Sequence, residues 1–169
     1  MRCGLAVTVS LRQVPARERT LETSSKGEII VKKFLALLAL GISVGAGGAH
    51  AQKVADLGMA GLDPKSGGAP KQVVIFFHGY TQRGMAMKPL ADTLAKRLPD
   101  AAFIFNDGPL SANDGKSWYV LRGEDTENTK GAVKKLAVDT VTKVSEGLKV
   151  PHDKIVVVGF SQGGGVAFD

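Results

Sequence analysis

The chain has 169 residues, a length that allows one globular domain, and it carries a net charge of +6. Most of this charge lies near the start, because residues 1–51 hold seven Lys or Arg against three Glu, a net +4, while residues 52–169 hold fifteen against thirteen, a net +2. No basic stripe with interleaved aromatic residues follows, which argues against nucleic-acid binding. The only cysteine is Cys3, so we expect neither a disulfide nor a thiolate metal site after residue 51.

A basic and then apolar segment lies near the start of the chain. Lys32 and Lys33 precede an apolar run over 34–44, and small residues then lead to Ala49-His50-Ala51. This pattern predicts a signal peptide over 31–51, cleaved after Ala51, and therefore a periplasmic or secreted protein. The run is shorter than the ~20 residues of a membrane-spanning helix, so no span is expected after cleavage. The alternative is a buried core helix.

Residues 1–30 precede this segment and are polar, with Pro15 and no periodic pattern. A signal peptide begins at the N-terminus, and a valine codon such as that of Val31 can start translation in bacteria. Our hypothesis is that residues 1–30 are a misassigned extension. N-terminal sequencing of the unprocessed precursor tests it, since Met1 as the first residue would contradict it.

Three short apolar runs, rich in β-branched or aromatic residues, read as buried strands at 73–77, 101–105 and 155–158. Apolar residues at helical spacing predict helices over the ranges 85–98 and 129–148. Segments rich in Gly, Pro, Asp and Ser predict loops over 52–71 and 106–127. Alternation of strands and helices predicts an α/β fold with a mostly parallel sheet and flanking helices.

The last predicted strand runs into Gly159-Phe160-Ser161-Gln162-Gly163. A buried strand, G-x-S-x-G and the start of a helix together indicate a nucleophile elbow, in which a strained turn lifts Ser161 clear of the sheet. A purely structural turn is the alternative. A phosphate-binding loop is excluded because the segment lacks the Lys-Ser/Thr ending and the G-x-G-x-x-G spacing.

An activated serine needs donors that hold the oxyanion. One donor is expected to be the backbone N–H of Gln162, which follows the nucleophile. The second is expected in the loop after an earlier strand, where His78-Gly79-Tyr80 offers the N–H of Tyr80. Gly79 lets the backbone turn toward the serine. Both loops leave the same edge of a parallel sheet and can therefore meet.

The serine also needs a general base, and the chain has three histidines. His50 belongs to the predicted signal peptide. His152 lies at the opposite end of the elbow strand, roughly 25–30 Å from Ser161 at about 3.3 Å per residue. His78 is on the correct edge, where an orienting or packing role in the oxyanion loop is favoured over that of base.

Three motifs in this order resemble the phospholipase/carboxylesterase family of α/β-hydrolases, which includes acyl-protein thioesterases. They are Phe76-Phe77-His78-Gly79, Ser117-Trp118-Tyr119 and Gly159-Phe160-Ser161-Gln162-Gly163-Gly164, and the resemblance covers roughly residues 71–168. It implies that residues 52–169 are the N-terminal part of an α/β-hydrolase domain, truncated after the elbow. It further implies that Ser161 is the nucleophile, with Tyr80 and Gln162 as oxyanion donors.

The resemblance implies hydrolysis of small carboxylic esters through an acyl-enzyme, without cofactor or metal. Trp118 and Tyr119 would lie near the acyl pocket, although a core aromatic pair is an equal alternative. Family members carry their catalytic Asp and His in the second half of the domain, so the fragment is expected to be inactive alone. Alternatives are a non-catalytic remnant or binding protein on a hydrolase scaffold, and an exported polyester depolymerase or feruloyl esterase.

Overall fold

The computed structural model describes residues 8–10 and 51–168 of the chain. The predicted signal peptide up to His50, and the predicted extension apart from Thr8–Ser10, lie outside these residues. In the described part of the chain, none of the helices has both the length and the apolar character needed to cross a membrane.

Three parallel strands form the centre of the sheet: β3 (Gln72–Phe77), β4 (Ala101–Asn106) and β7 (Ile155–Gly159). Strand β3 lies in the middle, paired in parallel with β4 on one side and with β7 on the other. These are the three strands predicted from the apolar runs, although β7 is less buried than predicted, since its first three residues are only half-buried. The side chains of β3 after its first residue, and of β4 before its last, are buried, as expected for strands covered on both faces.

Two three-residue strands complete the sheet, in the order β1-β7-β3-β4-β2. Strand β2 (Ala60–Leu62) pairs antiparallel with β4, and β1 (Thr8–Ser10) pairs antiparallel with β7. The prediction of an unbroken loop over 52–71 is therefore wrong at β2, and the 3-10 helix η1 (Val54–Leu57) precedes that strand. A three-residue segment is too short to show the period of two that predicts a strand, so it becomes a strand only through its pairing with β4.

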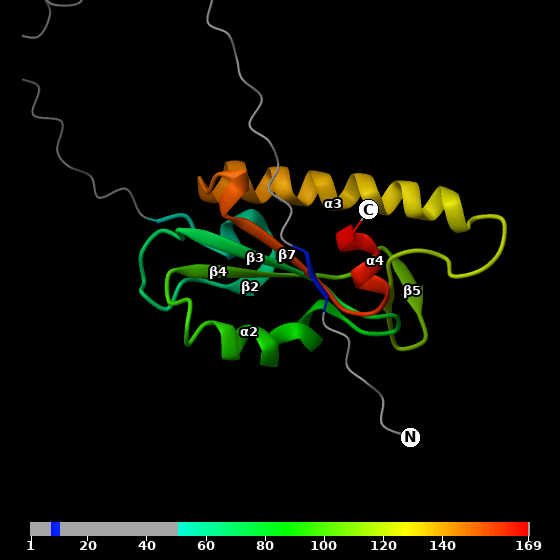
Figure 1. The fold of residues 1–169 in the computed structure, drawn as a ribbon, viewed down its shortest axis with the longest axis horizontal. Helices are drawn as coiled ribbons and strands as arrows, with labels where there is room; N and C mark the ends of the chain where they lie inside the picture. Colours follow the sequence, from blue (N-terminus) through cyan, green and yellow to red (C-terminus); the bar gives the residue numbers. More distant parts are fainter. Residues whose placement is uncertain (1–7, 11–50, 169) are drawn as a thin grey trace, which may run out of the picture. The chain divides into compact units, whose positions relative to one another are not determined.

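Helices cover both faces of the sheet, with α3 (Thr126–Leu148) on one side and α2 (Lys88–Leu94) on the other (Figure 1). One core cluster joins α3 to alternate residues of β3, including Val73, Ile75 and Phe77. A second cluster joins α2 to the residues between them on β3. The alternation of β-strand side chains thus supplies a core to each layer.

The helix predicted over 85–98 is shorter than expected. It consists of the 3-10 helix η2 (Gly84–Met87) followed by α2, which has Pro89 in its first turn, where the missing N–H costs nothing. The loop predicted over 106–127 is also partly wrong, because β5 (Leu110–Ala112) and β6 (Gly115–Ser117) form a hairpin in it. Its two-residue turn has Asn113 at φ +49°, a conformation that Asn tolerates.

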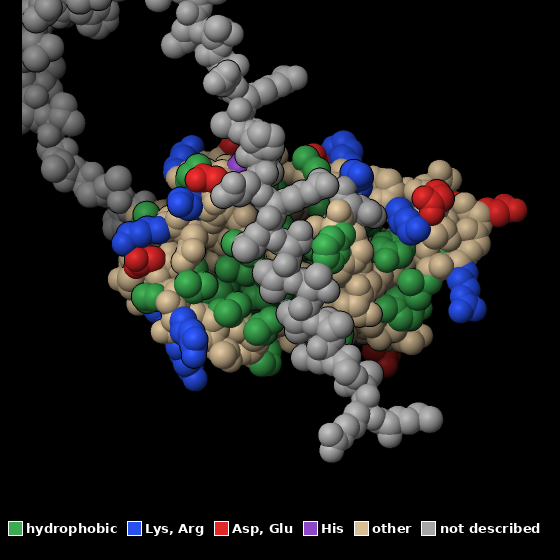
Figure 2. Space-filling model, viewed as in Figure 1, with side chains coloured by type: hydrophobic (Ala, Val, Ile, Leu, Met, Phe, Trp, Pro, Cys, Tyr) green, Lys and Arg blue, Asp and Glu red, His purple; other side chains and the backbone are tan. Residues whose placement is uncertain are grey.

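Two further elements frame the end of the described chain. The 3-10 helix η3 (His152–Lys154) leads into β7, and α4 (Gln162–Phe168) follows it. On the side of the molecule seen in Figure 1, hydrophobic side chains gather between the α3 and α2 layers, while Lys and Arg lie mainly toward the margins (Figure 2).

Candidate active site

The turn between β7 and α4 gives Ser161 an exposed position and an unusual backbone. Strand β7 ends at Gly159, α4 begins at Gln162, and Ser161 between them has φ +51°. A non-glycine residue in the left-handed region carries strain of about 1–2 kcal/mol, which packing on either side must offset. The strand, the strained serine and the helix start have the geometry described for a nucleophile elbow.

Two glycines let α4 pack closely against the sheet. A Cβ on Gly159 would lie 2.1 Å from the carbonyl oxygen of Gly163, and a Cβ on Gly163 would lie 2.1 Å from that of Phe77. Real Cβ atoms do not approach so closely, so each position requires glycine. The Phe160 N–H also donates to the Phe77 oxygen at 2.9 Å, which ties the elbow to the end of β3.

The segment after β3 forms a tight turn beside the elbow. The Gly79 N–H donates to Gln82 Oε1 at 2.9 Å, and the Gln82 N–H donates to the Gly79 oxygen at 3.1 Å. Because Gln82 already uses the Gly79 donor, the next N–H along the turn is that of Tyr80, whose residue is 44% exposed. A Cβ on Gly79 would lie 2.9 Å from a ring carbon of Phe160. The turn and the elbow are therefore neighbours.

His78 is fully buried at the base of this turn. Its Nδ1 lies 2.7 Å from the Gly79 oxygen, and its Nε2 lies 3.0 Å from the Gly108 nitrogen. A carbonyl oxygen only accepts and a backbone N–H only donates, so Nδ1 carries the proton and Nε2 accepts. With both nitrogens bonded and no exposed surface, His78 holds two loops together and has no free nitrogen for proton transfer.

Trp118 is also fully buried, and it packs on the same histidine. Its Nε1–H donates to the His78 oxygen at 2.7 Å, and its ring contacts that of Phe77 edge-on with centroids 4.9 Å apart. Trp118 therefore lies in the core, whereas Tyr119 is half-buried. The Tyr119 hydroxyl packs against α4, since a Cβ placed on Gly165 would lie 2.8 Å from it.

Sequence reasoning used only the backbone of Gln162 and missed its side chain. This residue is 5% exposed, and its Oε1 accepts from the Trp118 N–H at 2.9 Å. Its Nε2 donates to the Tyr119 oxygen at 2.7 Å and lies 3.0 Å from Ser117 Oγ. The residue that offers the expected oxyanion N–H therefore also fixes the 117–119 segment. The only sequence signal for this role was a polar residue within the glycine-rich elbow.

Neither described histidine is placed to act as a base for Ser161. His152 lies in η3 before β7, at the strand end remote from Ser161, and His78 is fully engaged. Among residues 51–168, no group of three or more His, Cys, Asp or Glu side chains could hold a metal ion. The described residues thus give Ser161 no histidine that is placed to accept its proton.

Comparison with known proteins gives relatives of one kind. Acyl-protein thioesterase 1 of Cryptococcus neoformans var. neoformans serotype D (strain JEC21) is 29% identical over 119 residues, covering 63% of this chain and 49% of the relative. Acyl-protein thioesterase 1 of Mycosarcoma maydis is 28% identical over 127 residues, covering 63% and 53%. The chain spans about half the length of these curated relatives.

Solved structures show the same fold. The Bacillus cereus carboxylesterase superposes with a TM-score of 0.52 at 21% identity, covering 64% of this chain and 50% of that one. The Mesorhizobium loti carboxylesterase gives 0.51 at 16%, covering 65% and 48%. At these identities the likeness establishes a partial α/β-hydrolase fold. The Phospholipase/Carboxylesterase family model matches residues 64–169, more than half of the chain, and the chain therefore belongs to the phospholipase/carboxylesterase family.

Proposed function

We propose that this chain carries the nucleophile and the oxyanion hole of a serine carboxylesterase or thioesterase that acts on small-molecule esters. The observation that carries the proposal is the conformation of Ser161, exposed at φ +51° between strand β7 and the start of α4. A purely structural turn would place glycine there at lower cost, because glycine adopts positive φ freely. Strain kept at a serine favours a role for its hydroxyl.

In the proposed reaction, Ser161 Oγ attacks the ester carbonyl carbon and loses its proton to a base. The negative charge that develops on the carbonyl oxygen is held by the N–H groups of Tyr80 and Gln162. Gln162 is the first residue of α4, so its N–H has no hydrogen-bond acceptor within the helix. Collapse breaks the ester bond, the base returns its proton to the departing alcohol or thiol, and water then hydrolyses the acyl-enzyme that remains. Tyr119, beside the elbow, would border the acyl group.

The base and its orienting carboxylate are proposed to come from a further segment of the same family domain. Neither described histidine can reach Ser161, and the curated relatives are about twice as long as the matched region. We therefore expect the 169-residue chain alone to be inactive. Reading the gene beyond codon 169 tests this, since an open frame with an Asp and then a His supports the proposal.

The direct test uses a fluorophosphonate probe, which labels activated serines, together with hydrolysis of p-nitrophenyl butyrate. In the complete gene product, Ser161→Ala is expected to abolish both labelling and turnover while leaving the circular dichroism spectrum unchanged. Ser111→Ala is the matched control, because Ser111 is an exposed serine on the β5–β6 hairpin. Labelling that survives Ser161→Ala would refute Ser161 as the nucleophile.

We also propose that the protein is exported. The support is the sequence pattern of residues 32–51, which lies almost wholly outside the described residues. Expression in a bacterial host with N-terminal sequencing of the periplasmic fraction is expected to find Gln52 as the first residue. A product that keeps residues 31–51 and stays with the cytoplasmic fraction would contradict export.

A further inference from the structure

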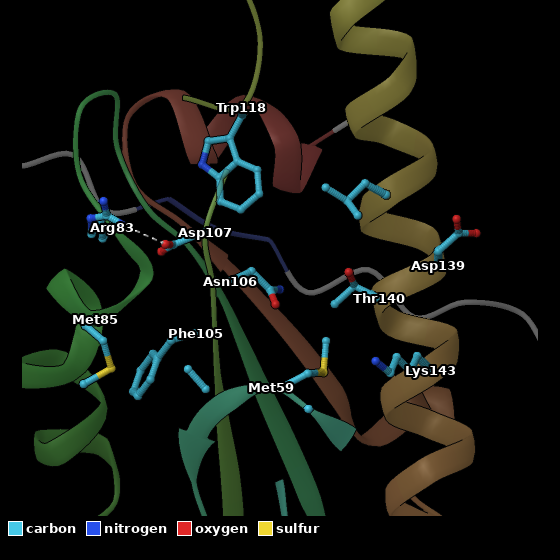
Figure 3. Close-up of a pocket in the computed structure, with 13 residues that line it drawn as sticks. Met59, Arg83, Met85, Phe105, Asn106, Asp107, Trp118, Asp139, Thr140 and Lys143 are labelled. Carbon is cyan, nitrogen blue, oxygen red and sulfur yellow. Dashed lines mark hydrogen bonds and ion pairs between the residues drawn. The ribbon is translucent and has the colours of Figure 1, made fainter. Parts of the chain in front are cut away.

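A cavity of about 660 Å³ lies between α3 and the β4–β2 side of the sheet, and Ser161 does not line it. Its volume is within the range of about 300–1,000 Å³ that is usual for small-molecule sites. Most of its wall is apolar, with Met59, Phe105, Trp118 and Leu136 among the lining residues (Figure 3).

One polar group in this cavity lacks a partner. The Nδ2 of Asn106, at the end of β4, is buried and makes no hydrogen bond within the described residues. Leaving a buried donor unpaired is costly, and such groups in native proteins call for an explanation. Figure 3 shows the Asn106 amide directed into the space between β4 and α3. An acceptor placed in the cavity would satisfy it.

A second donor faces the same space from α3. Thr140 is 7% exposed, lines the cavity, and points toward Asn106 in Figure 3. Its hydroxyl can donate one hydrogen bond, and the Asn106 amide donates another. A carbonyl oxygen has two lone pairs and can accept from both donors. Neither a hydrocarbon nor an ammonium group offers such an acceptor.

The formal charges of the side chains that line the cavity sum to zero. Two are positive, Arg83 and Lys143, and two are negative, Asp107 and Asp139. Arg83 Nη1 is held 3.2 Å from an Asp107 carboxylate oxygen, and Asp139 is held 2.6 Å from Lys135. A wall with no net charge and an apolar lining favours an uncharged ligand, because a charged one would lose its hydration without compensation.

Two apolar side chains are also exposed at the rim, beside these charged ones. Met85 is 51% exposed and Leu136 is 38% exposed, and both line the cavity. These side chains would extend the apolar surface that an alkyl chain entering the cavity covers. We propose that this cavity binds a small uncharged amphiphile, whose carbonyl oxygen accepts hydrogen bonds from Asn106 and Thr140 while its alkyl part lies against Met59, Phe105 and Leu136.

Hexan-2-one is a suitable probe, since it has one carbonyl and a short alkyl chain. Two signals report binding: the ¹⁵N-correlated side-chain amide resonance of Asn106, and the fluorescence of Trp118, which lines the cavity and is the only tryptophan. We expect saturable changes in both signals, giving one dissociation constant. Quenching that grows linearly without saturation, with no shift of the amide resonance, would overturn the proposal.

Variants separate the carbonyl contact from simple burial of the ketone. Asn106→Leu keeps the volume but removes the donor, and it is expected to weaken binding about three- to tenfold, the share of one net hydrogen bond. Thr140→Val is expected to weaken it by a similar factor. Asn128→Leu is the matched control, because Asn128 is exposed on α3 and is not among the lining residues.

The outcomes differ clearly from those for the proposed esterase. If Asn106→Leu and Thr140→Val leave hexan-2-one binding unchanged, the carbonyl contact is overturned. The same holds if the Asn106 amide resonance does not shift when the ketone is added, since the amide would then be bonded to water alone. Should Asn106→Leu not fold, Thr140→Val gives the same comparison. Ser161→Ala is expected to leave hexan-2-one binding unchanged, so loss of the esterase proposal would not affect this one.

Discussion

The side chain of Gln162 offers the sharpest experimental test, because its hydrogen bonds with the Trp118 N–H, the Tyr119 oxygen and Ser117 Oγ hold the 117–119 segment. Gln162→Met keeps the length of the side chain but leaves the buried Trp118 N–H without its acceptor, which lies at 2.9 Å. The Tyr119 oxygen keeps one donor, Ser117 Oγ at 2.9 Å. One orphaned buried donor costs about 1–3 kcal/mol, which lowers Tm by roughly 4–12 °C in a domain of about 120 residues.

Gln162→Glu refines the prediction because its effect depends on pH. The new carboxylate oxygen replaces the Nε2 donor and faces the Tyr119 oxygen, 2.7 Å from the present donor. Burial and this facing acceptor raise the pKa of the introduced carboxyl above its unfolded value of about 4.3. The protonated form restores a donor, so the variant is closest to wild type below about pH 4.3. Its deficit grows as the pH rises through the folded-state pKa.

The assay is urea unfolding followed by Trp118 fluorescence, between pH 4 and pH 8, on wild type and both variants. Gln72→Met is the control, since the Gln72 side chain is half-buried and has no hydrogen bond among the described residues. Wild-type stability in Gln162→Met would refute the role given to the Gln162 amide. So would a deficit of Gln162→Glu that is the same at pH 4 and pH 8.

Three smaller predictions concern the surrounding fold. Gly163→Ala should destabilise the fold by at least about 2 kcal/mol, because the new Cβ would lie 2.1 Å from a backbone oxygen of β3. Gly131→Ala in α3, where a Cβ would have nothing within 4 Å, should instead stabilise it by about 0.5–1 kcal/mol. Chemical denaturation measures both changes, and equal effects would contradict the packing described. Lys149→Gly should stabilise by up to about 1 kcal/mol, since Lys149 is the C-cap that follows α3 and has φ +57°. A lower denaturation midpoint would contradict this. The hydrogen bond from Lys71, and then that from Ser66, lowers the pKa of Asp100. The stability that the Asp100 carboxylate adds is therefore present above about pH 3.9 and is lost as the pH falls through its folded-state pKa. Asp100→Asn should slightly flatten the dependence of stability on pH in that acid range, because the Lys71–Asp100 pair is exposed and screened by salt, and an unchanged slope would show that the pair contributes nothing.

Much of the candidate site could be predicted because its signals are local. The strand Ile155–Gly159 and the spacing of its glycines predict the turn that places Ser161, and the end of β3 predicts the loop that carries Tyr80. Proximity of the two loops follows from parallel pairing, since both leave the same sheet edge. The use of each side chain could not be predicted in this way, because Gln162 finds its partners 43 to 45 residues away.

The sequence by itself determined the three central strands, the long helix α3 and the position of the strained turn. Each of these depends on a run long enough to show its own periodicity or a glycine that only one backbone allows. Only the tertiary structure decided the order of the strands, the short β2, the β5–β6 hairpin and the tautomer of His78. These features depend on contacts between groups that are far apart in the sequence. A three-residue strand or the ring of His78 shows no sequence pattern that specifies its partner. The unpaired amide of Asn106 belongs to the same class, because burial without a partner is a property of the packed chain.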